Sequence, residues 1–318
     1  MVVIPASAEG RIRLWRKNGN LVVLFALDPR LRGNDKLWGA YALFWDTPVC
    51  TQSSTMVNKS DILLAMKILS WNVNGVRAVQ KKGFLDWLQT ESPDILGLQE
   101  TKAHSEQLDI FLLNPAGYHT YWSKPEKKGY SGVAIFSKEK PKNVSFGYDG
   151  SRFDSEGRVV RADYDDFTFL SIYFPNGKAR EERLQYKMDF YAETMTYIKK
   201  LKKKQPRVII SGDYNTAHKE IDLARPKENA DVSGFLPIER AWLDDWVKAG
   251  QVDIFREFNK SPEQYTWWDM KSFARERNVG WRIDYHFVTE ALAGDVKRAW
   301  NLTEKTGSDH CPIAIQLR

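Results

Sequence analysis

The sequence predicts one α/β domain over residues 66–318, and three observations support this fold class. Short apolar runs typical of strands alternate with longer amphipathic stretches typical of helices. No linker, internal repeat or low-complexity segment interrupts this alternation. Hydrophobic residues make up 42% of the 318-residue chain, which is enough to bury a sizeable core. Strands and helices interspersed in this way are the pattern of an α/β domain.

The expected strands are short apolar runs that end in polar or turn-forming residues. The first passes through Ile68 and Leu69 and ends in a polar turn at 72–75. In order, the expected strands are 67–72, 94–99, 132–137, 159–164, 168–174, 207–211, 283–288 and 312–316.

The expected helices lie between these strands, over 78–90, 180–204 and 236–248. The longest has apolar residues at steps of four and three, which places them on one face of a helix. These residues are Leu184, Met188, Tyr191, Met195 and Ile198.

Composition restricts the class of protein. The 47 Lys and Arg residues exceed the 41 Asp and Glu residues, and this net charge of +6, together with 12 Trp, 13 Tyr and 16 Phe, weakly favours a polyanionic partner. Cys50 and Cys311 lie far apart and form no CxxC pair, which argues against a disulfide framework and a structural zinc site. The longest apolar runs, 21–27 and 37–45, are too short for a membrane helix of about 20 residues. We expect a reduced, cytoplasmic protein with no membrane partner.

Residues 1–65 differ from the rest of the chain. Pro and Gly residues break every short apolar run there, so neither a helical nor a strand period persists. Basic residues follow the opening apolar residues, which is not the layout of a secretory signal. Acidic residues such as Asp28 and Asp46 argue against a mitochondrial presequence. We expect an extension that is disordered, or one that results from a start assigned upstream of Met66.

Polar residues recur where the expected strands end. The six stretches are SWNVNG (70–75), LQETK (98–102), YFPNG (173–177), SGDYN (211–215), GWRIDY (280–285) and GSDHCP (307–312). Side chains at strand ends in a layered fold converge on one rim, where ligands usually bind. Carboxylates and carboxamides there suit a hard cation such as Mg²⁺, and an Asp–His pair adds proton transfer.

Each of these residues also has an ordinary structural explanation. Asn and Asp after a strand mostly form turns, and Glu100 would usually be a helix cap or an exposed charge. Asp309 and His310 would more often be a surface pair, and Tyr173 a core aromatic. These explanations weaken jointly, because all six stretches follow one another between residues 72 and 310.

Longer motifs identify a family. The strings SWNVNGVRA, LQETK, GYSGVAIFSK, IYFPNG, SGDYNTAHKEIDL, GFLPIER, NVGWRIDY and GSDHCP closely resemble the exonuclease III family of apurinic/apyrimidinic (AP) endonucleases. The resemblance covers 66–318 and none of 1–65. It implies a four-layer α/β sandwich of the deoxyribonuclease-I-like type, in which two packed β-sheets are flanked by helices. It also implies a nuclease that uses Mg²⁺, with Mn²⁺ as a substitute, and acts on double-stranded DNA as a monomer.

The resemblance assigns a metal group. Glu100 would be the central Mg²⁺ ligand, and Asp309 with the pair Asn72 and Asn74 would complete or support the metal shell. Asn74 stands where some relatives carry Asp, which removes one negative charge and weakens the expected ion affinity.

The same resemblance assigns catalytic roles to Tyr173, Asp213, Asn215, Asp284 and His310. Asp213 would position and deprotonate the attacking water, while Asn215 and Tyr173 contact the scissile phosphate. His310 would hydrogen-bond a phosphate oxygen, and Asp284 would orient His310. The chemistry is in-line displacement at phosphorus, in which donors stabilise the growing charge. Tyr173, Asp213 and His310 are all candidates for taking the proton.

The implied DNA contacts are of two kinds. Trp267, Trp281 and Ile283 match positions that line a tight apolar pocket for an abasic sugar, which is flipped out more cheaply than a paired nucleotide. Contacts to the phosphate and the DNA backbone are expected at Tyr130, Asn176 and Arg183. Departures from the family pattern at 177–183 and at 271–272 fall in loops that grip DNA and leave the substrate preference open.

We therefore expect a nuclease of DNA base excision repair that cuts 5′ to abasic sites and has 3′-exonuclease or 3′-end-cleaning activity. An enzyme specialised for removing 3′-phosphates or 3′-nucleotides, with weak AP cleavage, is the alternative. A lipid or inositol phosphodiesterase of the same superfamily is disfavoured by GWRIDY and SGDYNTAHKEIDL. The presence of Glu100, Asp213, Asp309 and His310 disfavours a catalytically silent DNA-binding module.

Overall fold

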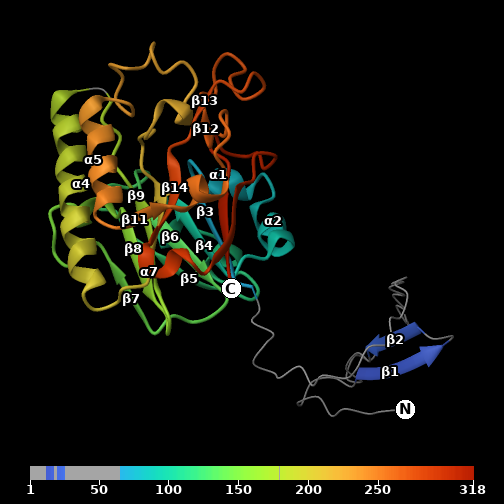
Figure 1. Ribbon diagram of the computed structural model, residues 1–318. Coiled ribbons are helices and arrows are strands. Elements are labelled where there is room, and N and C mark those ends of the chain that lie inside the picture. Colours follow the sequence, from blue (N-terminus) through green and yellow to red (C-terminus); the bar gives the residue numbers. More distant parts are fainter. Residues whose placement is uncertain (1–11, 18–19, 26–64, 179) are drawn as a thin grey trace. The chain divides into compact units, whose positions relative to one another are not determined.

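The computed structural model describes residues 12–17, 20–25, 65–178 and 180–318, in two units that span 1–61 and 62–318 (Figure 1). In the first unit, strands β1 (Ile12–Lys17) and β2 (Asn20–Phe25) pair antiparallel, a hairpin that the sequence pattern does not predict. The expectation that 1–65 is disordered or precedes the true start otherwise falls on residues outside those described.

The second unit contains two six-stranded sheets with the same plan. One has the order β11 (Gln251–Asp253), β14 (Asp284–Thr289), β10 (Val208–Asp213), β9 (Thr168–Tyr173), β8 (Val159–Asp163) and β7 (Asn143–Phe146). The other has the order β15 (Val296–Asn301), β16 (Ile313–Leu317), β3 (Lys67–Asn72), β4 (Ile95–Gln99), β6 (Val133–Ser137) and β5 (His119–Trp122). In each sheet the two central strands run parallel and every other pair is antiparallel.

The two sheets pack face to face, and successive residues of a strand serve different layers. Ile68 of β3 and Ile209 of β10 both belong to the core between the sheets. The next residue in each strand, Leu69 or Ile210, packs instead against helices on the outer face. Because both faces of these central strands are covered, the strands read as continuous apolar runs and not as alternating ones.

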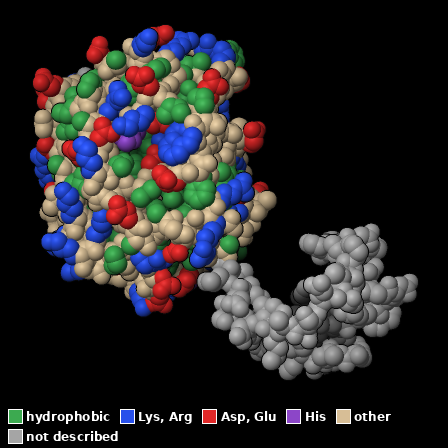
Figure 2. Space-filling view, viewed as in Figure 1, with side chains coloured by type: hydrophobic (Ala, Val, Ile, Leu, Met, Phe, Trp, Pro, Cys, Tyr) green, Lys and Arg blue, Asp and Glu red, His purple; other side chains and the backbone are tan. Residues whose placement is uncertain are grey.

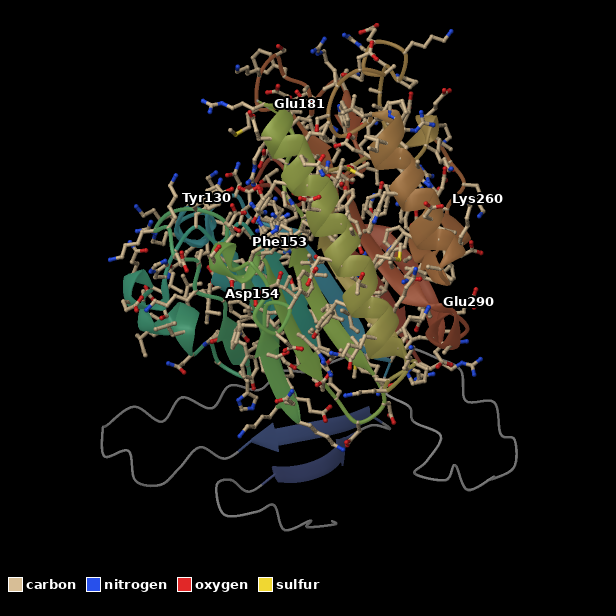
Figure 3. All side chains as sticks on the ribbon, turned by 90° about the vertical axis from the view of Figure 1, so that its left-hand side faces the viewer. Tyr130, Phe153, Asp154, Glu181, Lys260 and Glu290 are labelled. Carbon is tan, nitrogen blue, oxygen red and sulfur yellow. The ribbon has the colours of Figure 1, made fainter. Side chains whose placement is uncertain are left out.

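Helices form the two outer layers. Helices α4 (Glu181–Lys202) and α5 (Pro237–Lys248) lie side by side over the outer face of the sheet that contains β10 (Figures 1 and 3). Helices α1 (Val76–Gln80) and α2 (Phe84–Glu91) cover the other sheet. Three shorter helices follow, α3 (Ile110–Leu113), α6 (Ile254–Phe258) and α7 (Glu290–Ala293). The structure thus confirms the predicted four-layer α/β sandwich.

Two element boundaries are predicted wrongly. The single helix expected over 78–90 is broken into α1 and α2, because Gly83 adopts a left-handed conformation with φ of 81°. Strand β10 does not stop at Ser211 but continues to Asp213, which places that carboxylate on the strand itself. Among the described residues, no helix has the length and apolar character required to cross a membrane.

Several short elements have no sequence signal. Strands β12 (Trp267–Trp268) and β13 (Gly280–Trp281) are two residues each, which is too short for any periodicity. In edge strand β15 two consecutive exposed residues, Lys297 and Arg298, lie at a register shift, so no period-two pattern marks this strand.

Candidate active site

The candidate site lies at one edge of the stacked sheets, where strands of both sheets end. Asn72 closes β3, Tyr173 closes β9 and Asp213 closes β10, while Glu100 follows β4. Strand β14 runs antiparallel to β10, so its first residue, Asp284, is paired with Asp213. The predicted convergence of strand ends is therefore present.

Asn72 joins the two carboxylates that come from different sheets. Its fully buried Nδ2 donates to Glu100 Oε1 and to Asp213 Oδ2, both at 2.9 Å. Its Oδ1 accepts the backbone N–H of Asn74 at 3.0 Å. The Asn72 amide nitrogen thus fixes the spacing of Glu100 and Asp213 by donating to both. Its amide oxygen is already hydrogen-bonded to the backbone of Asn74.

Lys102 is the cation nearest to Glu100. Its Nζ lies 2.7 Å from Glu100 Oε2 and also donates to Asn74 Oδ1. Burial alone would raise the pKa of the Glu100 carboxyl, but the Lys102 charge and the hydrogen bond from Asn72 outweigh it and hold that pKa below its usual value. Glu100 is therefore ionised near neutral pH, as a metal ligand must be.

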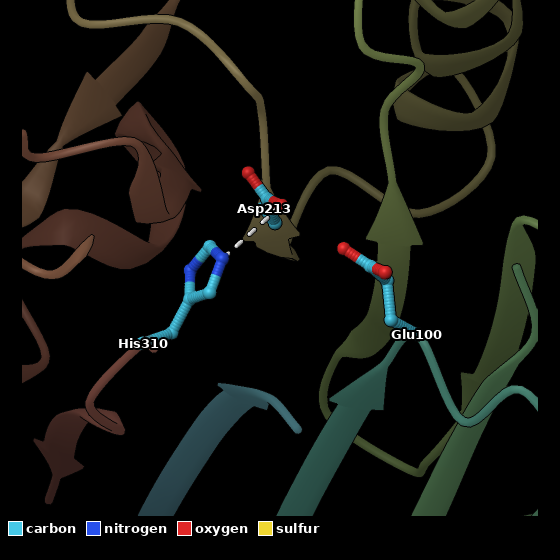
Figure 4. Close-up of side chains that lie close together, drawn as sticks. All are labelled: Glu100, Asp213 and His310. Carbon is cyan, nitrogen blue, oxygen red and sulfur yellow. Dashed lines mark ion pairs between the residues drawn. The ribbon is translucent and has the colours of Figure 1, made fainter. Parts of the chain in front are cut away.

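Glu100, Asp213 and His310 form a compact group that fits a divalent cation. One potential ligand atom from each lies within 4.8 Å of the others (Figure 4). The two carboxylates offer the hard oxygen donors that divalent cations take, whereas the imidazole could be a ligand only in its neutral form. These residues fit the metal dependence of the predicted family, without distinguishing one ion from another.

Asp309, expected to share the metal shell, lies beside this group and has other partners. Its Oδ1 accepts from Asn74 Nδ2 at 2.9 Å, and its Oδ2 accepts from Trp267 Nε1 at 3.0 Å. Burial would raise the pKa of Asp309, but the neighbouring His310 charge and these donors hold the pKa below its usual value. Asp309 therefore links the charged group to a tryptophan of the neighbouring cavity.

His310 and Asp284 form the predicted pair. His310 Nδ1 lies 2.9 Å from Asp284 Oδ2, which also accepts the Thr266 hydroxyl at 2.6 Å. Burial would lower the pKa of His310, but the Asp284 carboxylate outweighs it and raises the pKa to about 10. The free Nε2 faces Asp213 Oδ2 at 4.0 Å, the pair marked by a dashed line in Figure 4.

Asp213 is a buried carboxyl group whose pKa is raised. Burial, reinforced by the negative charge of Asp284, raises the pKa of Asp213 to about 7. The Asn215 backbone N–H donates to Asp213 Oδ1 at 2.7 Å, and Asn215 Nδ2 donates to Asp213 Oδ2 at 3.2 Å and to the Phe174 carbonyl at 3.0 Å. Asn215 therefore orients the Asp213 carboxylate, and its own amide is already held.

Tyr173 lies against an arginine that the sequence analysis does not single out. The Arg158 guanidinium carbon is 4.6 Å from the centroid of the Tyr173 ring, and its NH1 donates to the Tyr173 carbonyl at 3.0 Å. Burial, with the nearby Glu100 charge, raises the pKa of Tyr173 well above its usual value, so the phenol is neutral and can donate. Arg158 also donates to the Tyr130 hydroxyl, which accepts from Arg183 as well, at 3.0 and 2.9 Å. In the view of Figure 3, Tyr130 is labelled to the left of α4.

The predicted apolar residues line a cavity next to the charged group. Trp267 and Trp281 come from the paired strands β12 and β13, and their rings meet edge to face with centroids 6.4 Å apart. The cavity of about 180 Å³ is also lined by Ile283, Asn176, Asp213 and His310. Tyr130 and Arg183, by contrast, are not among its lining residues.

Two further lysines near the cavity are missing from the sequence prediction. Lys178 Nζ lies 5.4 and 5.7 Å from the ring centroids of Trp267 and Trp281. Lys187 is fully buried in α4 and bonds the carbonyl of Asn215. A lysine on an otherwise apolar helix face is the one signal that could have found Lys187.

Charge on the visible surface is mixed. Lys and Arg side chains are interspersed with Asp and Glu and do not form one continuous basic field (Figure 2). This face therefore offers no single basic patch to which a polyanion would bind.

Comparison with known proteins matches the chain to one family. Residues 69–310 match the model of the Endonuclease/Exonuclease/phosphatase family. An exodeoxyribonuclease of Bacillus subtilis is 43% identical over 252 residues, which cover 79% of this chain and 98% of that protein. The DNA repair nuclease APEX1 of Danio rerio is 42% identical over 257 residues, covering 79% of this chain and 82% of that protein.

A solved structure agrees in fold. A 3′ phosphatase from Neisseria, bound to a product DNA hairpin, superposes with a TM-score of 0.75 at 28% identity and covers 80% of this chain and 100% of that one.

Proposed function

The chain belongs to the Endonuclease/Exonuclease/phosphatase family, and from this premise we propose that it is a DNA repair nuclease that hydrolyses the phosphodiester 5′ to abasic sites. We include 3′-exonuclease or 3′-end-cleaning activity in the proposal. One observation carries it: the group Glu100, Asp213 and His310 borders a cavity walled by Trp267 and Trp281. Phosphoryl chemistry and an apolar sugar pocket are thus side by side.

The proposed cation is Mg²⁺, with Mn²⁺ as a substitute. Glu100 would hold it, with Asp309 and Asn74 alongside, and the bound ion would neutralise charge that builds up on the phosphate. The low pKa of Glu100 supports this role, since the carboxylate is already ionised.

We assign the water proton to Asp213. A base is most effective when its pKa lies near the working pH, and burial brings the pKa of Asp213 to about 7. Asn215 and Asn72 hold this carboxylate in place with three hydrogen bonds to its two oxygens. The base is therefore oriented before the substrate arrives.

Two donors would stabilise the phosphate oxygens. His310 is kept protonated by Asp284, so its Nε2 can donate to an oxygen that gains charge in the transition state. Tyr173, which also lines the cavity, stays a neutral phenol and can donate as well. His310 is buried and Tyr173 is partly buried, so water screens their interactions with the phosphate less than it would at the surface.

Recognition of the lesion is assigned to the cavity. Flipping an abasic nucleotide out of a duplex is cheaper than flipping a paired one, and a cavity walled by Trp267, Trp281 and Ile283 suits a bare sugar. We propose that the protein acts on duplex DNA as a monomer.

The test compares three duplex substrates: an internal abasic site, a nick with a 3′-phosphate, and a recessed 3′ end. Each is incubated with Mg²⁺, with Mn²⁺ and with EDTA. We expect incision 5′ to the abasic site to be the fastest reaction and EDTA to abolish all three. Removal of the 3′-phosphate with little incision would support the specialised 3′-phosphatase instead, an activity named for the Neisseria protein.

A further inference from the structure

A fully buried ion pair lies directly behind the reaction cavity. Lys187, in α4, and Glu239, in the first turn of α5, have no exposed side-chain surface, and their Nζ and Oε1 atoms are 2.6 Å apart. A buried ion pair is weak evidence for stability, because an apolar pair of similar volume often does as well. Its contacts suggest another reason for its presence.

Lys187 uses all three of its donors on groups near the site. Besides Glu239, its Nζ donates to the Asn215 carbonyl at 2.8 Å and to Thr216 Oγ1 at 2.7 Å. Two of the three hydrogen bonds of the ammonium group are thus made to the segment that follows β10.

Glu239 extends the network to a second loop. Its Oε1 accepts from the Ser233 hydroxyl at 2.9 Å, and its Oε2 accepts the backbone N–H groups of Gly234 and Leu236 at 2.6 and 3.0 Å. Ser233 and Gly234 both line the reaction cavity. The pair therefore holds a rim of the cavity as well as the Asn215 segment.

The Asn215 peptide has an uncommon conformation and is held from both sides. Asn215 is in the left-handed region with φ of 52°, which asparagine adopts more readily than most residues that have a side chain. Its N–H donates to Asp213 on one side, and its carbonyl is held by Lys187 on the other. Lys187 thus restrains the segment that orients the Asp213 carboxylate.

We propose that Lys187 and Glu239 are positioning residues for the reaction: the ion pair fixes the Asn215 peptide, and through it Asp213, relative to the cavity rim at Ser233 and Gly234. This inference rests on the proposed function, because Asp213 is its assumed base. Neither residue touches the substrate in this account. The pair acts on the rate through geometry, and displacement of a reacting group by about 1 Å can lower a rate about 10²-fold.

The test separates positioning from stability with the variants Lys187→Met, Glu239→Gln and the double variant. Each single change leaves one buried charge unpaired and should lower the Tm. The double variant removes both charges but keeps the volume and an acceptor for the Gly234 and Leu236 N–H groups, so its Tm should return toward that of the wild type. Its kcat on an abasic duplex should stay 10- to 100-fold low, because the Asn215 carbonyl has lost its donor.

Two readouts and two controls complete the experiment. In the double variant, KM and the Mg²⁺ concentration for half-maximal rate should change little, because Glu239→Gln keeps an acceptor for the N–H groups of Gly234 and Leu236 that hold the cavity rim. Lys187→Arg keeps the cation and its donors and should retain more kcat than Lys187→Met. Leu201→Ala, in the same helix and in the core away from the site, supplies a matched loss of Tm, and its kcat should remain near that of the wild type.

The outcomes are distinguishable from failure of the proposed function. If the wild type cleaves no abasic, nicked or recessed DNA, the proposed function fails whatever the variants do. If the wild type is active but kcat recovers in step with Tm in the double variant, the pair is only structural and the inference is overturned. Equal kcat losses in Leu201→Ala and Lys187→Met at equal Tm would overturn it as well.

Discussion

The charged and apolar halves of the site are built in different ways. The reaction group, Glu100, Asp213 and His310, is anchored at the ends of long central strands or just before β16, and it is tied by hydrogen bonds to both sheets. The recognition wall, Trp267, Trp281 and Ile283, belongs to a small satellite core, and its tryptophans lie on strands of only two residues. The proposed chemistry thus lies on the central strands, and the proposed recognition lies on short strands and loops that can change without altering the sheets.

The two halves also differ in their effect on stability. Burial raises the pKa of Asp213, so the folded state is destabilised when that group ionises. The tryptophans of the recognition wall instead bury apolar surface and stabilise the fold. Mutations in the reaction group should therefore lower the rate, and neutralising Asp213 should stabilise the fold. Mutations in the recognition wall should change selectivity and destabilise the fold.

The largest effects are expected at the His310–Asp284 pair. Asp284→Asn and His310→Asn should each lower kcat by about 10²–10⁴-fold, because the carboxylate keeps the imidazole charged and oriented. Coupled residues are strongly non-additive, so the double variant should be barely slower than the slower single variant. A double-mutant cycle on an abasic duplex at saturating Mg²⁺ measures this.

Thermal melts serve as the control for folding in that cycle. Losses that multiply would show that the two residues act independently, and the pair would no longer belong to one functional unit.

A smaller effect than at the His310–Asp284 pair is expected for Glu100→Gln, because a high Mg²⁺ concentration can offset part of the loss. The change removes a charge from a group where Asn74 already provides none, so it should act mainly through weaker Mg²⁺ binding. Titration with Mg²⁺ should shift the half-saturating concentration upward and recover part of the rate. A rate that stays flat at high Mg²⁺ would remove Glu100 from the role of main ligand.

The sequence predicts the reaction half better than its support. Strand-end residues such as Asn72 and Asp213 are recognisable because the continuous apolar run before them marks where the chain emerges from the sheet. Arg158 and Lys187 are not, because their partners Tyr173 and Asn215 lie in other segments that only the folded chain brings together. Lys102 lies two residues from its partner Glu100, but the sequence pattern does not show that the two side chains pair. The apolar run of a strand predicts where the strand ends. It does not predict which basic side chain contacts the residue at that end.

The recognition wall shows a second limit of the same kind. Trp267 and Trp281 are expected there only through family resemblance, because β12 and β13 are too short for a periodic pattern. The hydrogen bond from Trp267 Nε1 to Asp309, which joins the two halves, has no counterpart in the sequence pattern.

Trp281→Ala should change selectivity by about tenfold and kcat by less. Removing the ring opens the cavity between Phe235 and Trp267, so KM for the abasic duplex should rise and cleavage at undamaged nucleotides should increase. The measurement is the ratio of kcat/KM for abasic and intact duplexes. Trp122→Phe, in strand β5 and outside the cavity lining, is the control. A loss confined to kcat would contradict the division between the halves.

The smallest expected effect is a change in Tm, and its sign should differ between a variant of the reaction group, Asp213→Asn, and a variant of the recognition wall, Trp281→Ala. The pKa of Asp213 is raised from 3.8 to about 7 in the folded protein, so the folded state holds a proton that the unfolded chain releases between these values. Stability contributed by this group is therefore full below pH 3.8 and lost as pH rises through about 7. Asp213→Asn avoids that loss and should melt a few degrees above the wild type at pH 8, with the difference vanishing near pH 4.

Trp281→Ala should melt lower than the wild type at both pH values, because lost apolar burial does not titrate. Melts in EDTA exclude stabilisation by a bound cation, and a lower Tm for Asp213→Asn at pH 8 would show that its hydrogen bonds with Asn72 and Asn215 outweigh the burial of its charge.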